Sequence, residues 1–394
     1  MLNQLTPAAN DPILSLSSAY QLDSRHQKLN LGIGVYRDQQ GQTPVLATVK
    51  LAEQYLLENQ QSKAYVGLAG CEAFNAEMMN LVLGDNASRS RAVAVQTPGA
   101  SGALRLLADV IALANPKAKI WMSDLSYANH APIMTTAGLE VAYYPYFDPE
   151  TKRVNEAAML TTLSQLGEND VVLLHGCCHN PTGADISFAA WQAITEMAIQ
   201  SGFLPFIDIA YQGFGEGMQE DAAGFRYLAE HVPAYIAASS CSKNFGLYRE
   251  RTGLAIVASN TLAESECIKG RIIECARSTY TMPPDHGAAI VRYILQNSSL
   301  KAQWLDEVTA MRTRIQGVRH SLVKALRETT KTSQFDFIAQ HKGMFSVIGS
   351  NQQQLVQLRD QFGIYIVEGG RINIAGLRET EVPYLAESLG HVFK

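Results

Sequence analysis

Val171-Val172-Leu173-Leu174-His175 and Leu204-Pro205-Phe206-Ile207-Asp208-Ile209 are two short apolar runs, and between them residues 188–200 carry apolar side chains at helical spacing. Short runs that are apolar throughout are typical of strands buried on both faces of a sheet. A helix between two such strands allows them to lie parallel. This stretch therefore predicts a strand–helix–strand unit, and that unit decides the fold class.

The same alternation continues in both directions along the chain. Further strands are predicted by the apolar runs at residues 91–95, 119–122, 140–144, 234–239 and 253–258, and a further helix at residues 102–113. We therefore expect an α/β fold whose large domain has a mostly parallel seven-stranded sheet between helices.

The C-terminal part has a different pattern. Residues 300–329 are charged and helix-forming, and three shorter strand candidates follow them, at 343–348, 363–368 and 371–375. This change predicts a smaller α+β domain. We expect an N-terminal arm and part of the small domain at residues 1–45, the large domain at 46–305, and the C-terminal small domain at 306–394.

The composition of the 394-residue chain excludes several classes of protein. Hydrophobic residues make up 47% and charged residues 18%, as in a compact globular enzyme. The net charge is −5 and there is no basic run, so neither nucleic acid nor a membrane surface is an expected partner. Met1–Pro12 lacks the basic start and apolar centre of a secretory signal, which predicts a cytoplasmic protein.

The six cysteines show no disulfide-framework spacing and are predicted to be free thiols. His175, Cys177, Cys178 and His179 are residue types that bind metals, and they lie close together in the sequence. Adjacent side chains on a strand point to opposite faces, so Cys177 and Cys178 are not expected to share one ion. We therefore predict no metal site.

Two glycine-containing stretches are candidate ligand loops. Gly32-Ile33-Gly34 lacks the third glycine of a dinucleotide-binding fingerprint, and the chain contains no nucleoside-triphosphate loop motif. Gly99-Ala100-Ser101-Gly102 follows a predicted strand and opens a predicted helix. Its backbone N–H groups could bind a phosphate, although an ordinary strand-to-helix turn would explain the motif equally well.

Polar residues follow three neighbouring apolar runs. They are Asn180, Asp208 with Tyr211 close behind it, and Lys243 after Ala238-Ser239-Ser240-Cys241-Ser242. Alone, each has an ordinary explanation as a turn residue, a helix cap or a surface lysine. Ligands of open α/β sheets bind at the carboxyl ends of the strands, so we expect these side chains to meet in one crevice.

Together these residue types meet the needs of pyridoxal 5'-phosphate. A carboxylate such as Asp208 keeps a pyridine nitrogen protonated, and Asn180 and Tyr211 can donate hydrogen bonds to a phenolic oxygen. A desolvated lysine such as Lys243 is an amine that can attack an aldehyde. Serine hydroxyls, a helix N-terminus and an arginine suit a phosphate, and Ser101, Ser240, Ser242 and Arg251 are the candidates.

The sequence also resembles the class I aminotransferases of the aspartate aminotransferase subgroup, which have PLP fold type I. The resemblance covers essentially the whole chain in the family's order, and its motifs are Asn30–Tyr36, His175–Gly183, Asp208–Phe214, Ser242–Arg251 and Gly370–Gly376.

The resemblance implies a catalytic set and a cofactor-binding set. Lys243 would bind the cofactor as a Schiff base and move the Cα proton, with Asp208 on the pyridine nitrogen and Tyr211 on the phenolic oxygen. His130 would support Asp208 from behind. The other implied cofactor-binding residues are Tyr65 from the second subunit of a homodimer, Gly99, Ala100, Ser101, Tyr127, Asn180, Ser240, Ser242 and Arg251.

The resemblance also implies the substrate-binding residues. Arg371, with Asn180 and the backbone of Gly34, would bind the substrate α-carboxylate, and Tyr127 would lie over the cofactor ring. Arg277 matches the arginine that crosses from the partner subunit to a side-chain carboxylate. Arginine suits both tasks because its planar fork pairs a carboxylate through two hydrogen bonds.

Three positions depart from the family pattern. Tyr127 stands where tryptophan is usual, Met282 where asparagine is common, and Ala100 where glycine is usual. The first two bear on substrate preference, because they belong to the expected wall of the side-chain pocket.

The resemblance implies ping-pong transfer of the amino group of L-aspartate to 2-oxoglutarate, giving oxaloacetate and L-glutamate. A phenylalanine and tyrosine aminotransferase, with or without activity on aspartate, is the alternative. A β-lyase or decarboxylase would leave two carboxylate-binding arginines unexplained. A ligand-sensing regulator would need a DNA-binding module for which the chain has no room.

Overall fold

The computed structural model describes residues 2–7 and 12–393. The segment Met1–Pro12, in which the sequence predicts no secretory signal, includes residues 1 and 8–11, which lie outside the described residues. The chain divides into two compact units, Pro44–Arg314 and Met1–Thr43 with Ile315–Lys394. Within the described residues, no helix is long and apolar enough to cross a membrane.

The unit Pro44–Arg314 is built on a seven-stranded sheet of order β2-β10-β9-β8-β7-β3-β4. Only β10 runs antiparallel to its neighbours, so the mostly parallel sheet predicted from the sequence is confirmed. The strands are β2 (Ala92–Pro98), β3 (Lys119–Ser123), β4 (Glu140–Tyr144), β7 (Asp170–His175), β8 (Leu204–Ile209), β9 (Tyr235–Ser240) and β10 (Thr252–Ala258). All seven predicted apolar runs are strands, with ends shifted by at most a few residues.

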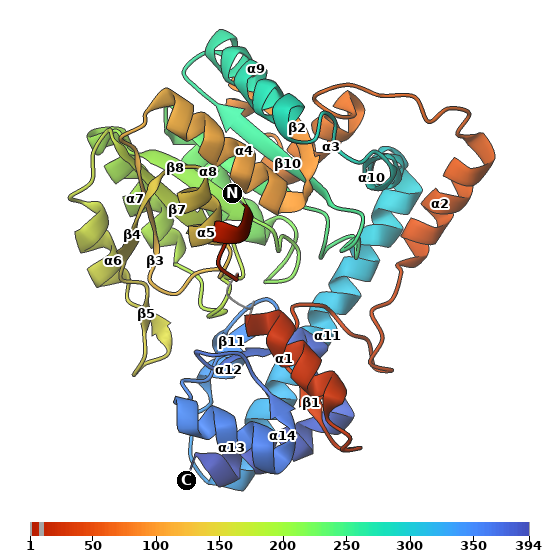
Figure 1. The fold of residues 1–394 in the computed structure, drawn as a ribbon, viewed down its shortest axis with the longest axis vertical. Coiled ribbons are helices and arrows are strands. Elements are labelled where there is room, and N and C mark those ends of the chain that lie inside the picture. The colour runs from red at the N-terminus through yellow and green to blue at the C-terminus, as the bar shows by residue number, and fades with distance from the viewer. Residues whose placement is uncertain (1, 8–11, 394) are drawn as a thin grey trace. The chain divides into compact units, whose positions relative to one another are not determined.

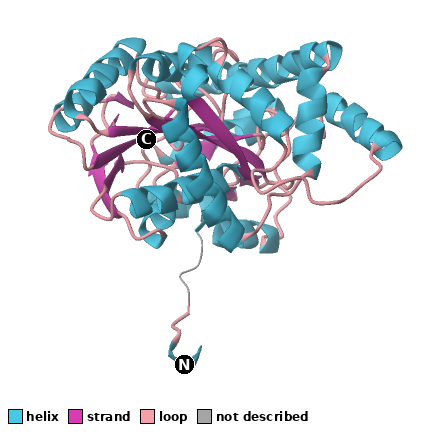
Figure 2. Cartoon of the chain, turned by 90° about the horizontal axis from the view of Figure 1, so that it is seen from above, coloured by secondary structure: helices cyan, strands magenta, loops and turns pink. Residues whose placement is uncertain are grey.

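Helices cover this sheet, as the cartoon in Figure 2 shows. Those of the unit are α2 (Ala47–Asn59), α3 (Glu72–Leu83), α4 (Gly99–Ala114), α5 (His130–Thr136), α6 (Glu156–Leu163), α7 (Phe188–Ser201), α8 (Ala223–His231), α9 (Leu262–Thr279), α10 (His286–Gln296) and the start of α11 (Ser298–Thr330). A two-stranded ribbon, β5 (Phe147–Asp148) with β6 (Arg153–Val154), lies outside the sheet (Figure 1).

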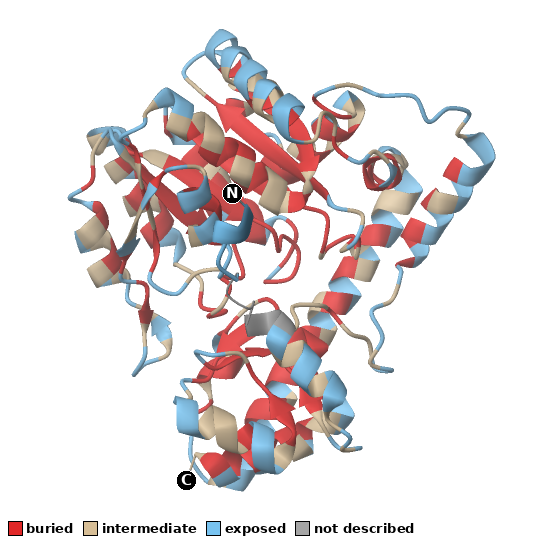
Figure 3. Ribbon diagram, in the orientation of Figure 1, coloured by how far each residue is buried: buried red, intermediate tan, exposed pale blue. Residues whose placement is uncertain are grey.

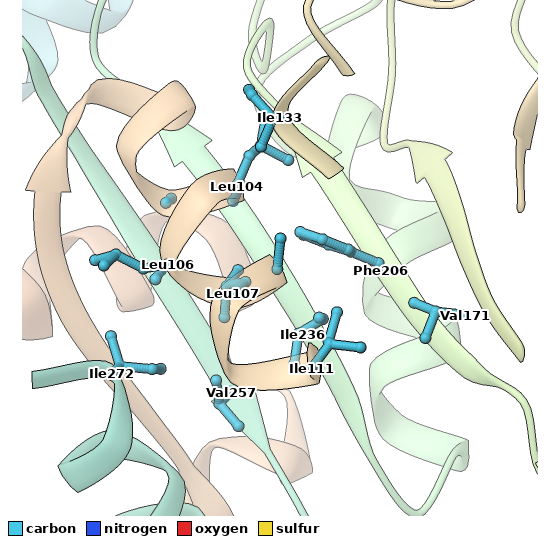
Figure 4. Packing of buried hydrophobic residues seen from close by; sticks show 14 of the residues in the cluster. Leu104, Leu106, Leu107, Ile111, Ile133, Val171, Phe206, Ile236, Val257 and Ile272 are labelled. Atoms are coloured by element: carbon cyan, nitrogen blue, oxygen red, sulfur yellow. The ribbon is translucent and has the colours of Figure 1, made fainter. Parts of the chain in front are cut away.

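The main core lies between the sheet and helices α4, α5 and α9. Leu104, Leu107 and Ile111 of α4 point at strand residues such as Phe206 and Ile236 (Figure 4). Alternate strand residues face opposite sides, and strands β7 to β10 are almost entirely buried, whereas the edge strand β4 is partly exposed (Figure 3). Burying these side chains is the largest favourable contribution to the stability of the unit. The sheet therefore forms a rigid base for the loops at its carboxyl edge.

The other unit is the smaller one. Its elements are α1 (Pro12–Leu22), β1 (Leu29–Asn30), the rest of α11, α12 (Phe337–Gln340), β11 (Phe345–Val347), α13 (Gln352–Phe362), β12 (Ile364–Tyr365), β13 (Arg371–Asn373) and α14 (Val382–Val392). β1 pairs parallel with β12, and β11 pairs antiparallel with β13. Arg319 is 1% exposed and donates to the carbonyls of Ile338, Gly343 and Phe345.

The three C-terminal strands predicted from the sequence exist but are shorter than expected. The pairing of β11 with β13 spans three residue pairs, and Ile374–Gly376 turns into a 3-10 helix. Apolar character alone continues past the last paired residue, because the same side chains fill the core of the unit. The sequence pattern therefore marked the buried segments more reliably than the ends of the strands.

Candidate active site

The carboxyl edge of strands β7, β8 and β9 gathers the polar residues that the sequence singles out. The three strands are parallel neighbours, and His175, Asp208 and Ala238 lie side by side in register. Asn180 follows the end of β7, and Lys243 follows the end of β9. Parallel strands place these ends at one edge of the sheet, so the predicted meeting of side chains has a structural basis.

Lys243 lies against Tyr211 in this cluster. Its Nζ is 4.9 Å from the centre of the Tyr211 ring. The Lys243 side chain is only partly accessible to water, and this burial, together with the charge of Arg251, lowers its pKa to about 8 against the opposing effect of Asp208. An amine with this pKa is neutral in a useful fraction of molecules near neutral pH, as a nucleophile must be.

Asp208 is a buried carboxylate with one occupied and one open oxygen. Its side chain is 8% exposed, and Oδ2 accepts a hydrogen bond of 2.9 Å from Nε2 of His130. Burial alone would raise the pKa of Asp208, but the His130 hydrogen bond and the nearby charges outweigh it and lower the pKa. Oδ1 is buried and has no hydrogen-bond partner among the described residues. A buried acceptor without a donor is costly, so the site is built to receive an N–H group.

A chain of hydrogen bonds continues behind Asp208. Nδ1 of His130 lies 2.9 Å from the hydroxyl of Ser126, which lies 3.3 Å from Nε2 of His175. Burial lowers the pKa of His175 to about 3, so this imidazole stays neutral. The edge of the Tyr127 ring meets His130 at 5.3 Å between centroids. Sequence analysis missed Ser126 and weighed His175 only as a metal ligand, although Ser126 stands beside Tyr127.

Asn180 and Tyr211 form the opposite wall of the cluster. Both are buried, and Nδ2 of Asn180 donates to the Tyr211 hydroxyl over 3.3 Å. Two carboxylates that sequence analysis missed hold their loops. Asp185 accepts from the backbone N–H groups just before Asn180, over 2.8 and 2.7 Å. Asp221 accepts from four backbone N–H groups just after Tyr211, the shortest over 2.8 Å.

The first turn of α4 forms a cradle suited to an anion. The helix begins at Gly99, directly after β2, as the sequence predicts, so Ala100 and Ser101 lie in its first turn. Gly99 has φ +69°, and a Cβ there would lie 2.6 Å from Nη2 of Arg251. A Cβ on Gly253 would lie 2.4 Å from the carbonyl carbon of Gly99. Only glycines allow this close approach of two backbones to a guanidinium.

Serine hydroxyls line the same cradle. Nη1 of Arg251 donates to Oγ of Ser242 over 3.4 Å, and Oγ of Ser240 accepts from the Ser242 backbone N–H over 3.1 Å. A helix N-terminus carries partial positive charge and unpaired N–H groups, and a guanidinium adds a full charge. The cradle is therefore suited to a phosphate group.

Arg371 lies in the smaller unit. It is buried on β13, its guanidinium carbon lies 4.4 Å from the centre of the Phe345 ring, and Nη2 donates to the Gly32 carbonyl over 2.5 Å. A Cβ on Gly34 would lie 2.9 Å from the same Phe345 ring. The Gly32–Gly34 backbone and Phe345 thus hold the guanidinium in one orientation.

Comparisons with known proteins agree with this geometry. The family model "Aminotransferase class I and II" matches residues 26–389. The chain belongs to this aminotransferase family. It is 42% identical to an aromatic-amino-acid aminotransferase of Paracoccus denitrificans, over 99% of each chain, and 42% identical to an aspartate aminotransferase of Escherichia coli, also over 99% of each.

A solved structure extends the similarity to the cofactor. An aromatic-amino-acid aminotransferase from Burkholderia pseudomallei, covalently bound to pyridoxal phosphate, matches with a TM-score of 0.97 at 38% identity over 100% of both chains. The expected PLP fold type I is confirmed, and pyridoxal 5'-phosphate is the cofactor of this aminotransferase. The open Oδ1 of Asp208, the amine of Lys243 and the cradle at Gly99 fit a pyridine nitrogen, an aldehyde and a phosphate respectively.

The prediction that Cys177 and Cys178 point to opposite faces of a strand is wrong. β7 ends at His175, and Cys178 has φ +51°, so the strand alternation does not apply to the two cysteines. Sγ of Cys177, Sγ of Cys178 and a carboxylate oxygen of Asp221 lie within 4.8 Å of one another. Both thiol pKa values are raised, by burial and neighbouring carboxylates, and the Asp221 oxygens already accept four hydrogen bonds. These features favour a packed structural cluster over an ion site.

Two of the implied site residues of the aminotransferase are exposed in the single chain. Tyr65 is 88% exposed, and Arg277 is exposed near the end of α9. The loop of Tyr65 lies close to the segment that follows α9, because the backbone N–H of Val66 lies 3.4 Å from Sδ of Met282. Neither side chain has a hydrogen bond or ion pair to another described residue. Their positions contrast with the buried cluster around Lys243.

Proposed function

We propose that this aminotransferase transfers the amino group of L-aspartate to 2-oxoglutarate by a ping-pong mechanism, giving oxaloacetate and L-glutamate. The observation that carries the proposal is the provision of two arginines, Arg371 and Arg277, one for each carboxylate of a dicarboxylic substrate. Arg371 is buried and held over Phe345, which suits a constant α-carboxylate. Arg277 is exposed and without an acidic partner among the described residues, so its charge is available for a ligand.

The residues around Lys243 have the chemistry that amino transfer requires. Pyridoxal phosphate, when bound, withdraws electrons from the substrate Cα and so makes its proton acidic. Asp208 would hold the pyridine N–H, while Asn180 and Tyr211 would donate to the phenolic oxygen. The amine of Lys243 would bind the cofactor aldehyde and, when released, would serve as the base that accepts the Cα proton of the substrate.

The remaining cofactor contacts follow from the cradle and from His130. We propose that His130 keeps Asp208 ionised through its hydrogen bond of 2.9 Å. The first turn of α4 would hold the phosphate, together with arginine and serine donors. The proposed phosphate ligands are Gly99, Ala100, Ser101, Ser240, Ser242 and Arg251.

We further propose a homodimer in which each active site uses two residues of the other subunit. Tyr65 would bind the cofactor phosphate and Arg277 the side-chain carboxylate of the substrate. Exposed apolar residues near Tyr65 support the proposal, because a partner would cover them: Val66 is 48% and Leu68 40% exposed on the same loop.

We also propose the cytoplasm as the compartment of the enzyme. All six cysteines are free thiols, which suits a reducing environment.

A second candidate is a preference for phenylalanine and tyrosine as amino donors. Met282 favours it, since an apolar, flexible side chain on the loop beside Tyr65 would accept an aromatic ring more readily than an asparagine would. Relatives of equal identity carry aromatic and aspartate names, which supports an enzyme that accepts both kinds of donor.

The two candidates are separated by a comparison of amino donors. Aspartate, phenylalanine and tyrosine are each assayed with 2-oxoglutarate in the wild type, in Arg277→Leu and in Arg271→Leu, an exposed arginine of the same helix that pairs with Glu274. We expect aspartate to have the highest kcat/KM and to lose about 10²-fold or more in Arg277→Leu, with phenylalanine little changed. A wild type that prefers aromatic donors by a wide margin would establish the second candidate instead.

A further inference from the structure

A second polar pocket lies in the unit Pro44–Arg314, away from the residues of the proposed active site. It has a volume of about 530 Å³. Residues at the end of α3, the start of α8 and the first turn of α11 line it, among them Asn80, Gln219 and Lys301. Sites for small molecules have volumes of about 300–1,000 Å³, so the pocket is large enough for a metabolite.

The pocket concentrates positive charge in a chain whose net charge is −5. Arg89, Arg226 and Lys301 line it with a single carboxylate, that of Asp85. The Asp85 side chain is fully exposed and lies 3.9 Å from Nη1 of Arg89. An exposed ion pair of this kind contributes little and does not neutralise the pocket. The lining therefore has an excess of two positive charges.

Helix capping explains part of the arginine placement but leaves donors unused. Arg226 donates from Nε to the Val82 carbonyl and from Nη2 to the Leu81 carbonyl, and from Nη1 to Gln219. A guanidinium has five N–H donors, so two remain on Arg226. Arg89 donates one hydrogen bond to the Gly84 carbonyl and one to Asn80.

Arg89 and Arg226 are held in place before any ligand binds. Their bonds to backbone carbonyls at the end of α3 hold them in place, so little side-chain entropy remains to be lost when a ligand binds. Arg226 is partly buried, so its guanidinium has lost part of its hydration, and this burial lowers its pKa. A partly desolvated guanidinium binds an oxyanion more strongly than a hydrated one does.

Lys301 is the residue that helix capping does not explain. It lies on the first turns of α11, and its ammonium group has no hydrogen bond or ion pair with another described residue. A lysine that lines a pocket beside two arginines repels them unless an anion lies between the three charges. The pocket thus has the composition of an oxyanion site that the amino-transfer reaction does not use.

We propose that this pocket binds a small dianionic oxyanion, such as a phosphate monoester, at a site separate from that of pyridoxal phosphate and the amino acid. Arg226 and Arg89 bind the oxygens through their remaining N–H donors, and Lys301 supplies the third charge. Neutral polar atoms of Asn80 and Gln219 stand beside the arginines. The inference does not depend on which amino acid is the substrate.

The test is a calorimetric titration of the holoenzyme, whose own phosphate cradle is filled by the cofactor. The probes are inorganic phosphate, glycerol 3-phosphate and succinate, each at constant ionic strength set with chloride. Lys301→Gln removes the charge without breaking a hydrogen bond or ion pair among the described residues. Lys117→Gln is the matched control, because Lys117 is exposed and its side chain is likewise unpaired among the described residues.

We expect phosphate and its ester to bind one per chain, about tenfold more weakly in Lys301→Gln, and unchanged in Lys117→Gln. The KM for the amino donor should stay constant as phosphate is added, because the sites are separate. Absence of saturable binding up to about 10 mM would overturn the proposal. So would equal affinity in Lys301→Gln, tighter binding of succinate than of phosphate, or competition with the amino donor.

Discussion

The buried cluster around Lys243 contrasts with two exposed residues, Tyr65 on a loop and Arg277 near the end of α9. In the cluster, the Asp208 side chain is 8% exposed and its charge is fixed by a hydrogen bond from His130. Tyr65, in contrast, is 88% exposed, and its side chain has no hydrogen bond to another described residue. The contrast teaches that the groups proposed to hold the cofactor ring lie together within one chain, whereas Tyr65 and Arg277 would need a second chain to take part in the site.

Burial and exposure also have different physical effects on the two sets of residues. Burial at the cluster changes pKa values and holds donors and acceptors in place before the ligand arrives. Exposure of Tyr65 and Arg277 leaves their polar groups hydrated, so their interactions would become stronger only if a partner chain removed that water. Variants in the cluster around Lys243 should therefore lower activity more than variants of Tyr65 and Arg277.

The largest effect is expected at Lys243. Lys243→Ala should lower kcat by about 10⁴-fold or more, because no other described amine lies against Tyr211. Steady-state transamination measures it, with Lys117→Ala as the control for loss of an ordinary lysine. Turnover of Lys243→Ala within tenfold of the wild type would contradict the catalytic role proposed for the buried Lys243.

The next largest effect is expected at Asp208. Asp208→Asn keeps an acceptor for His130 but removes the charge, so kcat should fall by about 10²- to 10³-fold. The same variant should bind the cofactor more weakly, which the visible absorption during dialysis measures. Asp109→Asn, at a partly exposed carboxylate paired with Arg105, should change neither quantity.

The sequence predicted the buried half of the site well and the loop geometry poorly. Asn180, Asp208 and Lys243 could be found because apolar runs mark buried strands, and a polar residue at the end of such a run stands out. Ser126, Asp185 and Asp221 could not be found, since they act through backbone turns and hydrogen bonds that have no fixed spacing in the sequence.

The error at Cys177 and Cys178 has the same origin. The strand pattern was extended past His175, where the chain turns and Cys178 adopts a positive φ. Side-chain alternation holds only within a paired strand. Strands β11 and β13 are shorter than predicted for the same reason, because apolar side chains continue beyond the last paired residue. Strand ends depend on tertiary contacts that a local pattern does not contain.

A smaller effect is expected from pH. Burial lowers the pKa of Lys243 to about 8, and a lysine captures an aldehyde only when it is neutral. The rate of pyridoxal phosphate capture by the cofactor-free protein should rise about tenfold between pH 7 and pH 9 and then level off. Stopped-flow absorption measures the rate. A rise that continues beyond pH 10 would mean that Lys243 has an ordinary pKa and is not desolvated.

The smallest expected effect is a partial recovery of activity when two inactive variants are mixed. It tests whether the exposed Arg277 acts in the active site of the other subunit. In a mixed dimer of Lys243→Ala and Arg277→Leu, one site keeps an intact Lys243 and the partner's intact arginine. Random reassociation should restore about a quarter of the wild-type activity on aspartate. Recovery of no activity, with mixed dimers present by mass measurement, would show that Arg277 does not act across subunits.

The attachment of the cofactor tests the central claim most directly. The holoenzyme is reduced with borohydride, which makes the bond between the lysine amine and the cofactor permanent, and its peptides are mapped by mass. The account predicts a single modified peptide, with the pyridoxyl mass on Lys243. Modification of another lysine, or an unmodified Lys243 in a protein with full cofactor content, would contradict it.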